Sequence, residues 1–304
     1  MGLGILCSGQ GGQHAGMLDV LAGEPATQRI FDRAAAAGWD DPRRLVAGDP
    51  ARLTRNRVAQ PLLCLVQAAA WAALAPLLPP PLAVAGYSIG ELTAYHVAGA
   101  LALDPLLALA SARAGAMDAA MARTGEAGAM LAVRGLDRPT LLSFGGEIAI
   151  ANGPDRYVIG GTAGHVALLR DRLEAAGAAV TAIAVDIASH TSMMAPAVAP
   201  FHAALAAAPF TAPLCPVLAG IDGAPVFHPD RARASLASQL VRTVEWAACL
   251  DGLRERGCTL LLELGPGDAL SRMAQSHLPG MPVRALADFR SLRGAAAWVE
   301  RQST

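Results

Sequence analysis

Residues 84–91, Val-Ala-Gly-Tyr-Ser-Ile-Gly-Glu, join an apolar strand predicted over residues 82–86 to a helix that follows the turn. A serine at such a strand-to-helix turn lies on a sharp bend, with its hydroxyl exposed and the helix N-terminus behind it. Gly86 and Gly90 leave space where a Cβ atom would clash with the neighbouring strand or helix. The Gly-x-Ser-x-Gly pattern therefore predicts a nucleophile at Ser88. A tight structural turn is the alternative, because the chain contains 31 glycines.

The first third of the chain alternates short apolar strands with helices. A buried strand is predicted over residues 3–7, and a glycine-rich loop follows it at residues 8–13. This order predicts an α/β fold, with an α/β-hydrolase-like large subdomain whose mostly parallel sheet is wrapped by helices. The helices predicted in this part cover residues 14–21, 25–37, 61–78, 90–97 and 105–122.

The pattern changes near residues 124–128 and returns to helix–strand alternation from residue 187. The order of elements between these points predicts a small inserted α+β subdomain of ferredoxin-like type. We therefore assign residues 1–122 and 187–304 to the large subdomain and residues 123–186 to the small one. Strands are predicted over 129–134, 147–151, 157–160, 179–186, 216–219 and 259–263, and helices over 139–143, 163–176, 193–207, 231–240, 244–256 and 269–276.

Composition excludes several classes of protein. Of 304 residues, 53% are hydrophobic and 16% charged, which is typical of a compact folded chain with a large core. The net charge of −1 and the absence of a basic run give no field for nucleic acid or an anionic membrane. The cysteines are odd in number (5) and scattered without a Cys-x-x-Cys pair. They indicate reduced thiols in a cytoplasmic protein and no zinc site.

The apolar stretch Pro61 to Leu78 has about the minimum length for a membrane-spanning helix. Gln67 lies near its middle and Pro76 near its end, so a buried core helix is the favoured interpretation. The N-terminus lacks a basic region before its apolar residues, and residues 2–6 lack the Ser or Thr of a myristoylation signal. We therefore expect a soluble protein without a membrane partner.

A serine nucleophile needs a base. His190 lies in residues 186–193, Asp-Ile-Ala-Ser-His-Thr-Ser-Met, where a strand end leads into a helix. Since α/β sheets collect site residues at the carboxyl ends of their strands, His190 is the favoured base. His277 is the main competitor, because an α/β-hydrolase keeps its base near the C-terminus. The histidines expected on helices with no catalytic role are His96, His165 and His202.

An ordered set of segments extends across nearly the whole chain. It comprises residues 8–13 (SGQGGQ), 86–91 (GYSIGE), 112–117 (ARAGAM), 189–190 (SH), 238–246 (SQLVRTVEW) and 263–267 (ELGPG). In the same order and spacing, these segments resemble the motifs of the malonyl-CoA:acyl carrier protein transacylases. Those motifs are Pro-Gly-Gln-Gly-Ser-Gln, Gly-His-Ser-x-Gly-Glu, Arg-Gly-x-x-Met, Ser-His, Gln-Leu…Val-x-Trp and Glu-x-Gly-Pro-Gly.

The resemblance implies a Ser-His dyad. Ser88 would attack the thioester carbonyl and His190 would take its proton, with the backbone carbonyl of Gln239 orienting the imidazole. The backbone N–H groups of Gln10 and Ile89 would form the oxyanion hole. The reaction implied is malonyl transfer from malonyl-CoA to an acyl carrier protein, through a malonyl-serine intermediate and with ping-pong kinetics.

The resemblance also implies how the substrate is recognised. Arg113 would bind the free carboxylate of the malonyl group bidentately, and Asn152 matches a pocket asparagine of the small subdomain. No cofactor or metal is implied, because malonyl-CoA and CoA are substrates and the acceptor carries a phosphopantetheine-type arm. Taken alone, Arg113 could be an exposed helix arginine, and Gly9 to Gly12 a phosphate-binding loop.

Two positions depart from the family pattern: Tyr87 replaces its histidine and Ser8 its proline. Tyr87 and the tail at residues 284–292 (RALADFRSL) resemble the malonyltransferase (epsilon) subunit of bacterial malonate decarboxylase. That resemblance implies the carrier subunit of malonate decarboxylase as the acceptor. The alternatives are a malonyl-CoA:acyl carrier protein transacylase of fatty-acid synthesis, a serine thioesterase or esterase, and a carrier-docking subunit with a vestigial site.

Overall fold

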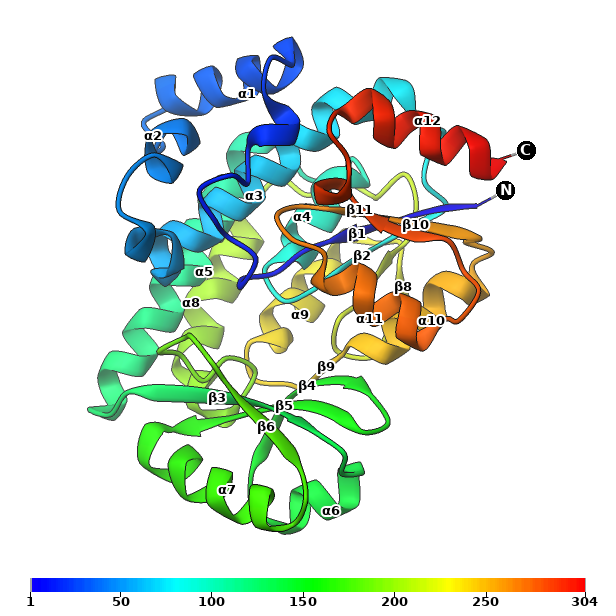
Figure 1. The fold of residues 1–304 in the computed structure, drawn as a ribbon. Coiled ribbons are helices and arrows are strands. Elements are labelled where there is room, and N and C mark those ends of the chain that lie inside the picture. Colours follow the sequence, from blue (N-terminus) through cyan, green and yellow to red (C-terminus); the bar gives the residue numbers. More distant parts are fainter. Residues whose placement is uncertain (1, 304) are drawn as a thin grey trace.

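A computed structural model describes residues 2–303 (Figure 1). Within these residues, the larger sheet has six strands in the order β11-β10-β1-β2-β7-β8. All neighbouring pairs are parallel except β7 and β8, which are antiparallel. The strands are β1 (Leu3–Cys7), β2 (Ala83–Gly86), β7 (Val217–Leu218), β8 (Pro225–Val226), β10 (Leu260–Leu264) and β11 (Val283–Ala285).

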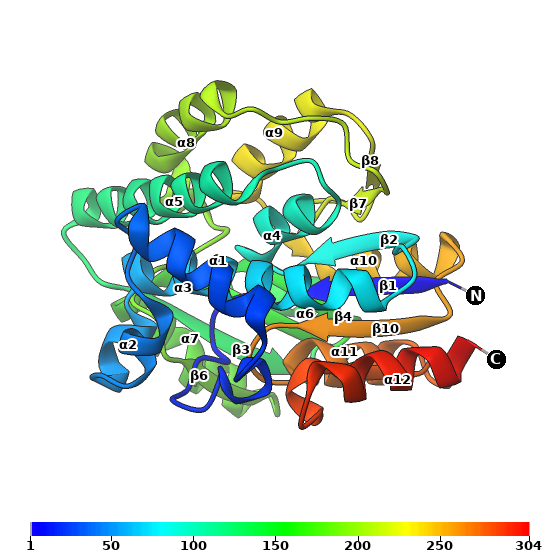
Figure 2. The same cartoon turned by 90° about the horizontal axis from the view of Figure 1, so that it is seen from above.

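Helices cover both faces of this sheet, as parallel strands require. In Figure 1, α3 and α12 lie on one side of β1 and β10, and α10 and α11 lie on the other. Figure 2 shows α5, α8 and α9 grouped beyond α4, past the β2 side of the sheet. The helices of this part are α1 (Pro25–Ala36), α2 (Pro42–Val46), α3 (Asn56–Leu74), α4 (Gly90–Val97), α5 (Leu103–Thr124), α8 (Ala195–Ala207), α9 (Pro229–Gln239), α10 (Trp246–Glu255), α11 (Ala269–His277) and α12 (Leu292–Ser303).

Strand β1 shows why the sheet is buried on both sides. Successive side chains of a strand point to opposite faces. Leu3 and Ile5 belong to the core cluster that includes residues of α3 and α12, whereas Leu6 belongs to the cluster that includes residues of α10 and α11. The continuous apolar run of β1 is therefore the pattern of a central parallel strand.

A second sheet, at the bottom of Figure 1, has the order β6-β3-β5-β4-β9. Its inserted part, β3-α6-β4-β5-α7-β6, is antiparallel and has the ferredoxin-like succession of elements. One face packs on the core shared with α10 and α11, and the other is covered by α6 and α7. The elements are β3 (Gly128–Arg134), α6 (Arg138–Ser143), β4 (Glu147–Gly153), β5 (Arg156–Thr162), α7 (Ala163–Ala175) and β6 (Ala179–Ile183).

The fifth strand of this sheet comes from outside the insert. Strand β9 (Val244–Glu245) pairs in parallel with β4, through Ile150 opposite Val244. The Thr243 hydroxyl donates to the carbonyl of Ile148 at 2.7 Å, and Arg138 forms an ion pair with Glu245 at 2.6 Å. The loop that follows α9 is therefore fastened to the small sheet.

Helix α3 is the long apolar segment. Residues 56–77 pass a length and composition test for a membrane span, but 67% of the apolar window is buried inside the protein. Gln60 and Gln67 are fully buried, and the Nε2 of Gln67 donates to the carbonyl of Ser8 at 3.0 Å. Both observations favour the predicted core helix.

Two helix predictions were wrong. Residues 14–21 contain only the short 3-10 turn Asp19–Leu21, because Gly16 interrupts the pattern and its N–H donates to the His14 ring at 3.1 Å. The helix predicted over 244–256 begins two residues later, since Val244 and Glu245 form β9. Neither periodicity nor propensity reveals a pairing with a strand about ninety residues away.

Candidate active site

The turn between β2 and α4 has the geometry predicted for a nucleophile. Ser88 has φ = 55°, in the left-handed region that costs a non-glycine residue energy. A Cβ on Gly86 would lie 2.3 Å from the carbonyl oxygen of Gly90, and one on Gly90 would lie 2.1 Å from that of Cys7. The two glycines are therefore required for β2, α4 and the end of β1 to meet at this bend.

The glycine-rich loop after β1 packs directly on this turn. A Cβ on Gly9 would lie 2.7 Å from the carbonyl oxygen of Tyr87, and one on Gly12 would lie 2.3 Å from that of Pro266. The Ser8 hydroxyl donates to the carbonyl of Leu264 at 2.7 Å. The 8–13 and 263–267 segments thus support each other and hold Gln10 beside the serine turn.

The acid of the 263–267 segment, Glu263, has a structural role. Glu263 is fully buried, and its carboxylate accepts from the N–H groups of Leu270 (3.2 Å) and Ser271 (2.7 Å) at the start of α11. Burial raises the pKa of Glu263 to about 7, while the hydrogen bonds from Ser271 and Leu270 lower it. This carboxylate caps a helix and does not contact Ser88.

Ser88 and His190 form a hydrogen-bonded pair. The Oγ of Ser88 lies 2.8 Å from the Nε2 of His190, and the Nδ1 of His190 lies 2.6 Å from the carbonyl oxygen of Gln239. A carbonyl can only accept, so Nδ1 carries the proton and Nε2 is free to accept the serine proton. His190 also has a positive φ, 62°, and together with Ser88 makes up the non-glycine residues with positive φ among those described.

The environment of His190 favours its neutral form. Burial and, to a smaller extent, the nearby cation of Arg113 together lower the pKa of His190 to about 3, against the hydrogen bond to Gln239, which raises it. A neutral imidazole next to a serine hydroxyl is ready to accept a proton.

Arg113 is buried at the centre of the site, 2% exposed, and does not lie on the surface. It donates to Gln60 Oε1 (2.9 Å), Gln239 Oε1 (3.1 Å) and Ser88 Oγ (3.2 Å), all of which are neutral. No ion pair includes Arg113 in the part of the chain that the structure describes. Burial lowers its pKa to about 10, so the guanidinium is still charged at neutral pH.

The N–H groups of Gln10 and Ile89 face no acceptor of the protein within residues 2–303. Buried or semi-buried amide groups are almost always paired, so two unpaired donors beside a serine are notable. Both belong to loops that pack against each other at the serine turn. Their arrangement suits a negatively charged oxygen that forms during reaction.

The other predicted residues lie elsewhere. The Nε2 of His277 lies 3.2 Å from the carboxylate of Asp251, and His277 makes no contact with Ser88. Asn152, on β4, lies beside Tyr87; its buried Oδ1 has no hydrogen-bond partner among the described residues, and no hydrogen bond links Asn152 to Ser88 or Arg113 there. Tyr87 packs edge-on against Trp246, with ring centroids 5.3 Å apart, and burial raises its pKa to about 12.

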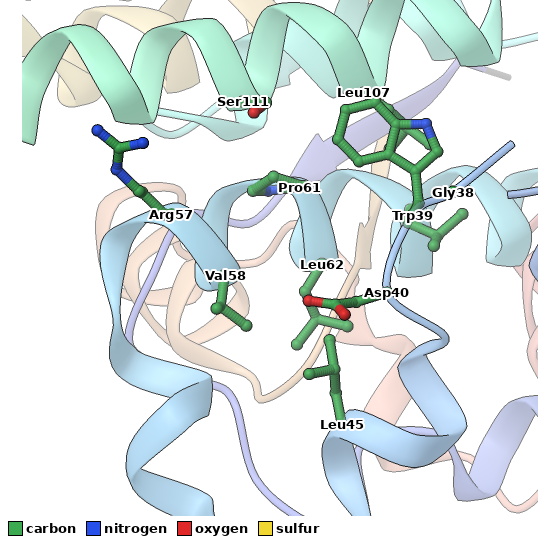
Figure 3. A pocket seen from close by; sticks show the side chains of 11 residues that line it. Gly38, Trp39, Asp40, Leu45, Arg57, Val58, Pro61, Leu62, Leu107 and Ser111 are labelled. Carbon is green, nitrogen blue, oxygen red and sulfur yellow. The ribbon is translucent and has the colours of Figure 1, made fainter. Parts of the chain in front are cut away.

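One hollow adjoins the candidate site, and another lies apart from its residues. One of about 380 Å³ is lined by Gln10 and Ser189 together with Arg55 and Asn56, and so adjoins the Ser88–His190 pair. The other, of about 220 Å³, lies between α3, α5 and residues 38–45, with Trp39 and Arg57 at opposite ends (Figure 3). None of the candidate catalytic residues lines this second hollow.

The sequence prediction missed two residues. Gln60 accepts a hydrogen bond from Arg113. A polar side chain within an otherwise apolar helix is the sequence feature that could have indicated this role. Glu91 is fully buried and accepts from Gln239 Nε2 at 2.5 Å and from the N–H of Gly220 at 3.0 Å. Burial raises the pKa of Glu91 to about 7, and these donors and Arg113 lower it. Its only signal was its place in the 86–91 motif.

Among residues 2–303, no group of three or more His, Cys, Asp or Glu side chains is arranged to hold a metal ion. All five cysteines are free thiols; four are buried and Cys215 is partly exposed.

Known proteins resemble this chain over nearly its whole length. The sequence matches the acyl transferase domain family over residues 5–278. A malonyl CoA-acyl carrier protein transacylase of Mycobacterium tuberculosis is 35% identical over 294 residues, covering 93% of this chain and 96% of that protein.

Solved structures agree with the sequence matches. The malonyl CoA-acyl carrier protein transacylase from Coxiella burnetii is 28% identical with a TM-score of 0.92, covering 99% of this chain and 97% of that one. A malonyl-transacylase in complex with its type II polyketide synthase acyl carrier protein is 28% identical with a TM-score of 0.91, covering 98% and 99%. This chain therefore belongs to the acyl transferase domain family and is an acyltransferase of the malonyl-CoA:acyl carrier protein transacylase type.

Proposed function

We propose that this acyltransferase moves a malonyl group from malonyl-CoA to the thiol of an acyl carrier protein, through a malonyl ester on Ser88. The observation that carries the proposal is that one serine oxygen contacts both a neutral histidine at 2.8 Å and a buried arginine at 3.2 Å. The first contact supplies a base, and the second supplies a cation for an acyl group that ends in a carboxylate. The family's malonyl transacylases support the same reaction.

In the first half-reaction, the Ser88 oxygen forms a bond to the thioester carbon while its proton passes to the Nε2 of His190. The negative charge on the carbonyl oxygen is stabilised by the N–H groups of Gln10 and Ile89. The carbon–sulfur bond then breaks, and His190 returns the proton to the sulfur of CoA. The Gln239 carbonyl holds the imidazole in one tautomer throughout, which replaces the carboxylate of a Ser-His-Asp triad.

In the second half-reaction, the thiol of the carrier arm gives its proton to His190 and attacks the ester carbon. The Ser88 oxygen leaves and recovers the proton. The hollow lined by Gln10, Arg55 and Ser189 supports entry of a long flexible arm to the serine. Asn152 stays a predicted substrate-binding residue, and its place on β4 beside Tyr87 supports a position near the serine turn.

Mass spectrometry after brief exposure to malonyl-CoA tests the proposal. We expect one adduct of malonyl mass on the peptide that contains Ser88, and no adduct in Ser88→Ala. Addition of a carrier protein with its phosphopantetheine arm should move the adduct to the carrier. An unmodified wild-type enzyme would reject the proposal, and release of free malonate in place of transfer would favour a thioesterase.

A second candidate concerns the acceptor. The relatives and solved structures named above are transacylases of acyl carrier proteins, which supports an acyl carrier protein as the acceptor. Only the resemblance of Tyr87 and the tail at residues 284–292 to the malonyltransferase subunit of malonate decarboxylase supports the carrier subunit of that enzyme. A direct test gives the malonyl-enzyme equal amounts of the fatty-acid carrier protein and the malonate decarboxylase carrier. Faster transfer to the second carrier would support this candidate, and faster transfer to the first would reject it.

A further inference from the structure

We propose that Glu91 is a positioning residue: through the side chain of Gln239 it holds the guanidinium of Arg113 beside Ser88, and so sets the preference for an acyl group that carries a carboxylate. This inference rests on the proposed malonyl transfer. Glu91 does not touch Arg113, and we assign it no contact with the substrate.

The carboxylate of Glu91 is a fully buried acceptor. It is on the first turn of α4, and its Oε2 accepts from the Nε2 of Gln239 at 2.5 Å and from the N–H of Gly220 at 3.0 Å. Its Oε1 lies 3.5 Å from the hydroxyl of Ser235. The contact with Gln239 is the short one, as expected for a hydrogen bond to an ionised acceptor.

Every polar atom of the Gln239 side chain is used. Its Nε2 donates to Glu91 and, at 3.3 Å, to the carbonyl of Ser88, while its Oε1 accepts from Arg113 at 3.1 Å. An ionised carboxylate only accepts and a guanidinium only donates. The amide between them therefore has one satisfied orientation. Its backbone carbonyl meanwhile accepts from His190, so one residue links the two active-site groups.

The Gln239 amide keeps the carboxylate of Glu91 out of direct contact with the Arg113 guanidinium. A carboxylate in direct contact with Arg113 would occupy the guanidinium in the bidentate geometry that a malonyl carboxylate needs. Placed one amide further away, Glu91 partly offsets the buried cation and fixes its position, while the guanidinium stays available to the substrate. Loss of Glu91 would let the amide and then Arg113 move, and recognition of the carboxylate would suffer more than attack by Ser88.

The test compares acylation of Ser88 by malonyl-CoA and by acetyl-CoA, measured by quenched flow and mass spectrometry at a pH above the pKa of about 7 of Glu91. We expect Glu91→Ala to lower the malonyl-to-acetyl rate ratio by about tenfold, the equivalent of about 1.4 kcal/mol for a charge-assisted hydrogen bond. Glu91→Gln keeps an acceptor but loses the charge, so its ratio should fall between those of the wild type and Glu91→Ala.

Ser235→Ala is the matched control, because Ser235 contacts the same carboxylate but not Gln239, and it should leave the ratio unchanged. In a Gln239→Leu background, which keeps the backbone carbonyl for His190, Glu91→Gln should have no further effect on the ratio. A wild-type ratio in Glu91→Gln and Glu91→Ala, with both rates lowered in parallel, would overturn the proposal. If Glu91→Ala does not fold, the ratio for Glu91→Gln decides.

Crystal structures of the wild type and Glu91→Gln separate this inference from the proposed function. If malonyl-CoA does not acylate the wild type, the proposed function fails. The positioning role is then judged from the side chains: it predicts that Arg113 leaves Ser88 or that the Gln239 amide becomes disordered in the variant. Unchanged positions of both side chains would overturn it.

Discussion

Arg113 and Arg43 are two arginines in opposite circumstances. Arg43, at the start of α2, has a side chain 38% exposed and pairs with the carboxylates of Asp32 (2.7 Å) and Asp41 (2.9 Å), which raise its pKa. Arg113 is buried, its partners are neutral amides and a hydroxyl, and burial lowers its pKa.

Arg43, paired with carboxylates of the protein, stabilises the fold, whereas Arg113, which has no charged partner, is available to bind a ligand. A buried charge without a charged partner costs stability, whereas an exposed pair contributes little either way. The buried Arg113 beside Ser88 therefore destabilises the fold, but its guanidinium has no carboxylate partner and can bind the carboxylate of a substrate. The predictions below test that contrast.

The largest effect is expected from loss of the base. His190→Ala should lower acylation of Ser88 by about a thousandfold with both malonyl-CoA and acetyl-CoA, because proton transfer is needed whatever the acyl group. Quenched-flow mass spectrometry with the two donors measures this. A loss confined to malonyl-CoA would mean that His190 recognises the carboxylate, and that the division of labour with Arg113 is wrong.

Removal of the Arg113 guanidinium should lower acylation of Ser88 by malonyl-CoA and not by acetyl-CoA. Arg113→Ala is expected to lower acylation by malonyl-CoA by about a hundredfold, since a buried charge-assisted pair with the substrate is lost, and to favour acetyl-CoA by comparison. Competition between the two donors in one reaction gives the ratio directly. An unchanged ratio would place the carboxylate elsewhere in the site.

The same substitution should change the pH profile. Burial and the Arg113 cation hold the pKa of His190 near 3. Acylation of the wild type by acetyl-CoA should thus stay constant down to about pH 5, where an ordinary histidine would be protonated. Without the cation the imidazolium is less disfavoured, so the pKa rises and the acid limb of Arg113→Ala should lie at higher pH. Superimposable profiles would show that the two groups do not interact.

The smallest effect is expected at the surface pair. Arg43→Ala should lower the free energy of unfolding at neutral pH by about 0.5 kcal/mol and leave both acylation rates unchanged. Arg43 lowers the pKa of Asp41 below 3.8, so this contribution is present above the unfolded pKa of Asp41 and is lost as the pH falls through its folded pKa. Urea titrations at neutral and acid pH check the sign; a larger effect in acid would contradict it.

The parts of the molecule that could be predicted from the sequence are those determined by residues close together in the chain. The serine turn depends on residues close in sequence, with Gly86 and Gly90 on either side of Ser88, so the motif was sufficient. The core strands β1 and β10 were predicted because both of their faces are apolar. The ferredoxin-like order followed in the same way from the alternation of short strands with helices.

Other features depend on contacts between distant residues, which one sequence does not reveal. Strand β9 has two residues and exists only because β4 lies beside it. Gln60 and Glu91 are ordinary members of helices until α5 and α9 bring Arg113 and Gln239 to them. Taken alone, Arg113 has the pattern of an exposed helix residue; the family resemblance placed it in the site, but its burial and its neutral partners follow only from the packing around it.

The pairing of β9 with β4 limits how this protein can be recombined with its relatives. A chimera that exchanges only the inserted segment would replace β4 and Arg138 but keep the resident Thr243, Val244 and Glu245. Because those residues lie four to six positions after Gln239, a poor match at the seam would disturb the carbonyl that holds the catalytic imidazole. Exchanges intended to alter substrate choice should therefore carry residues 243–245 together with the insert.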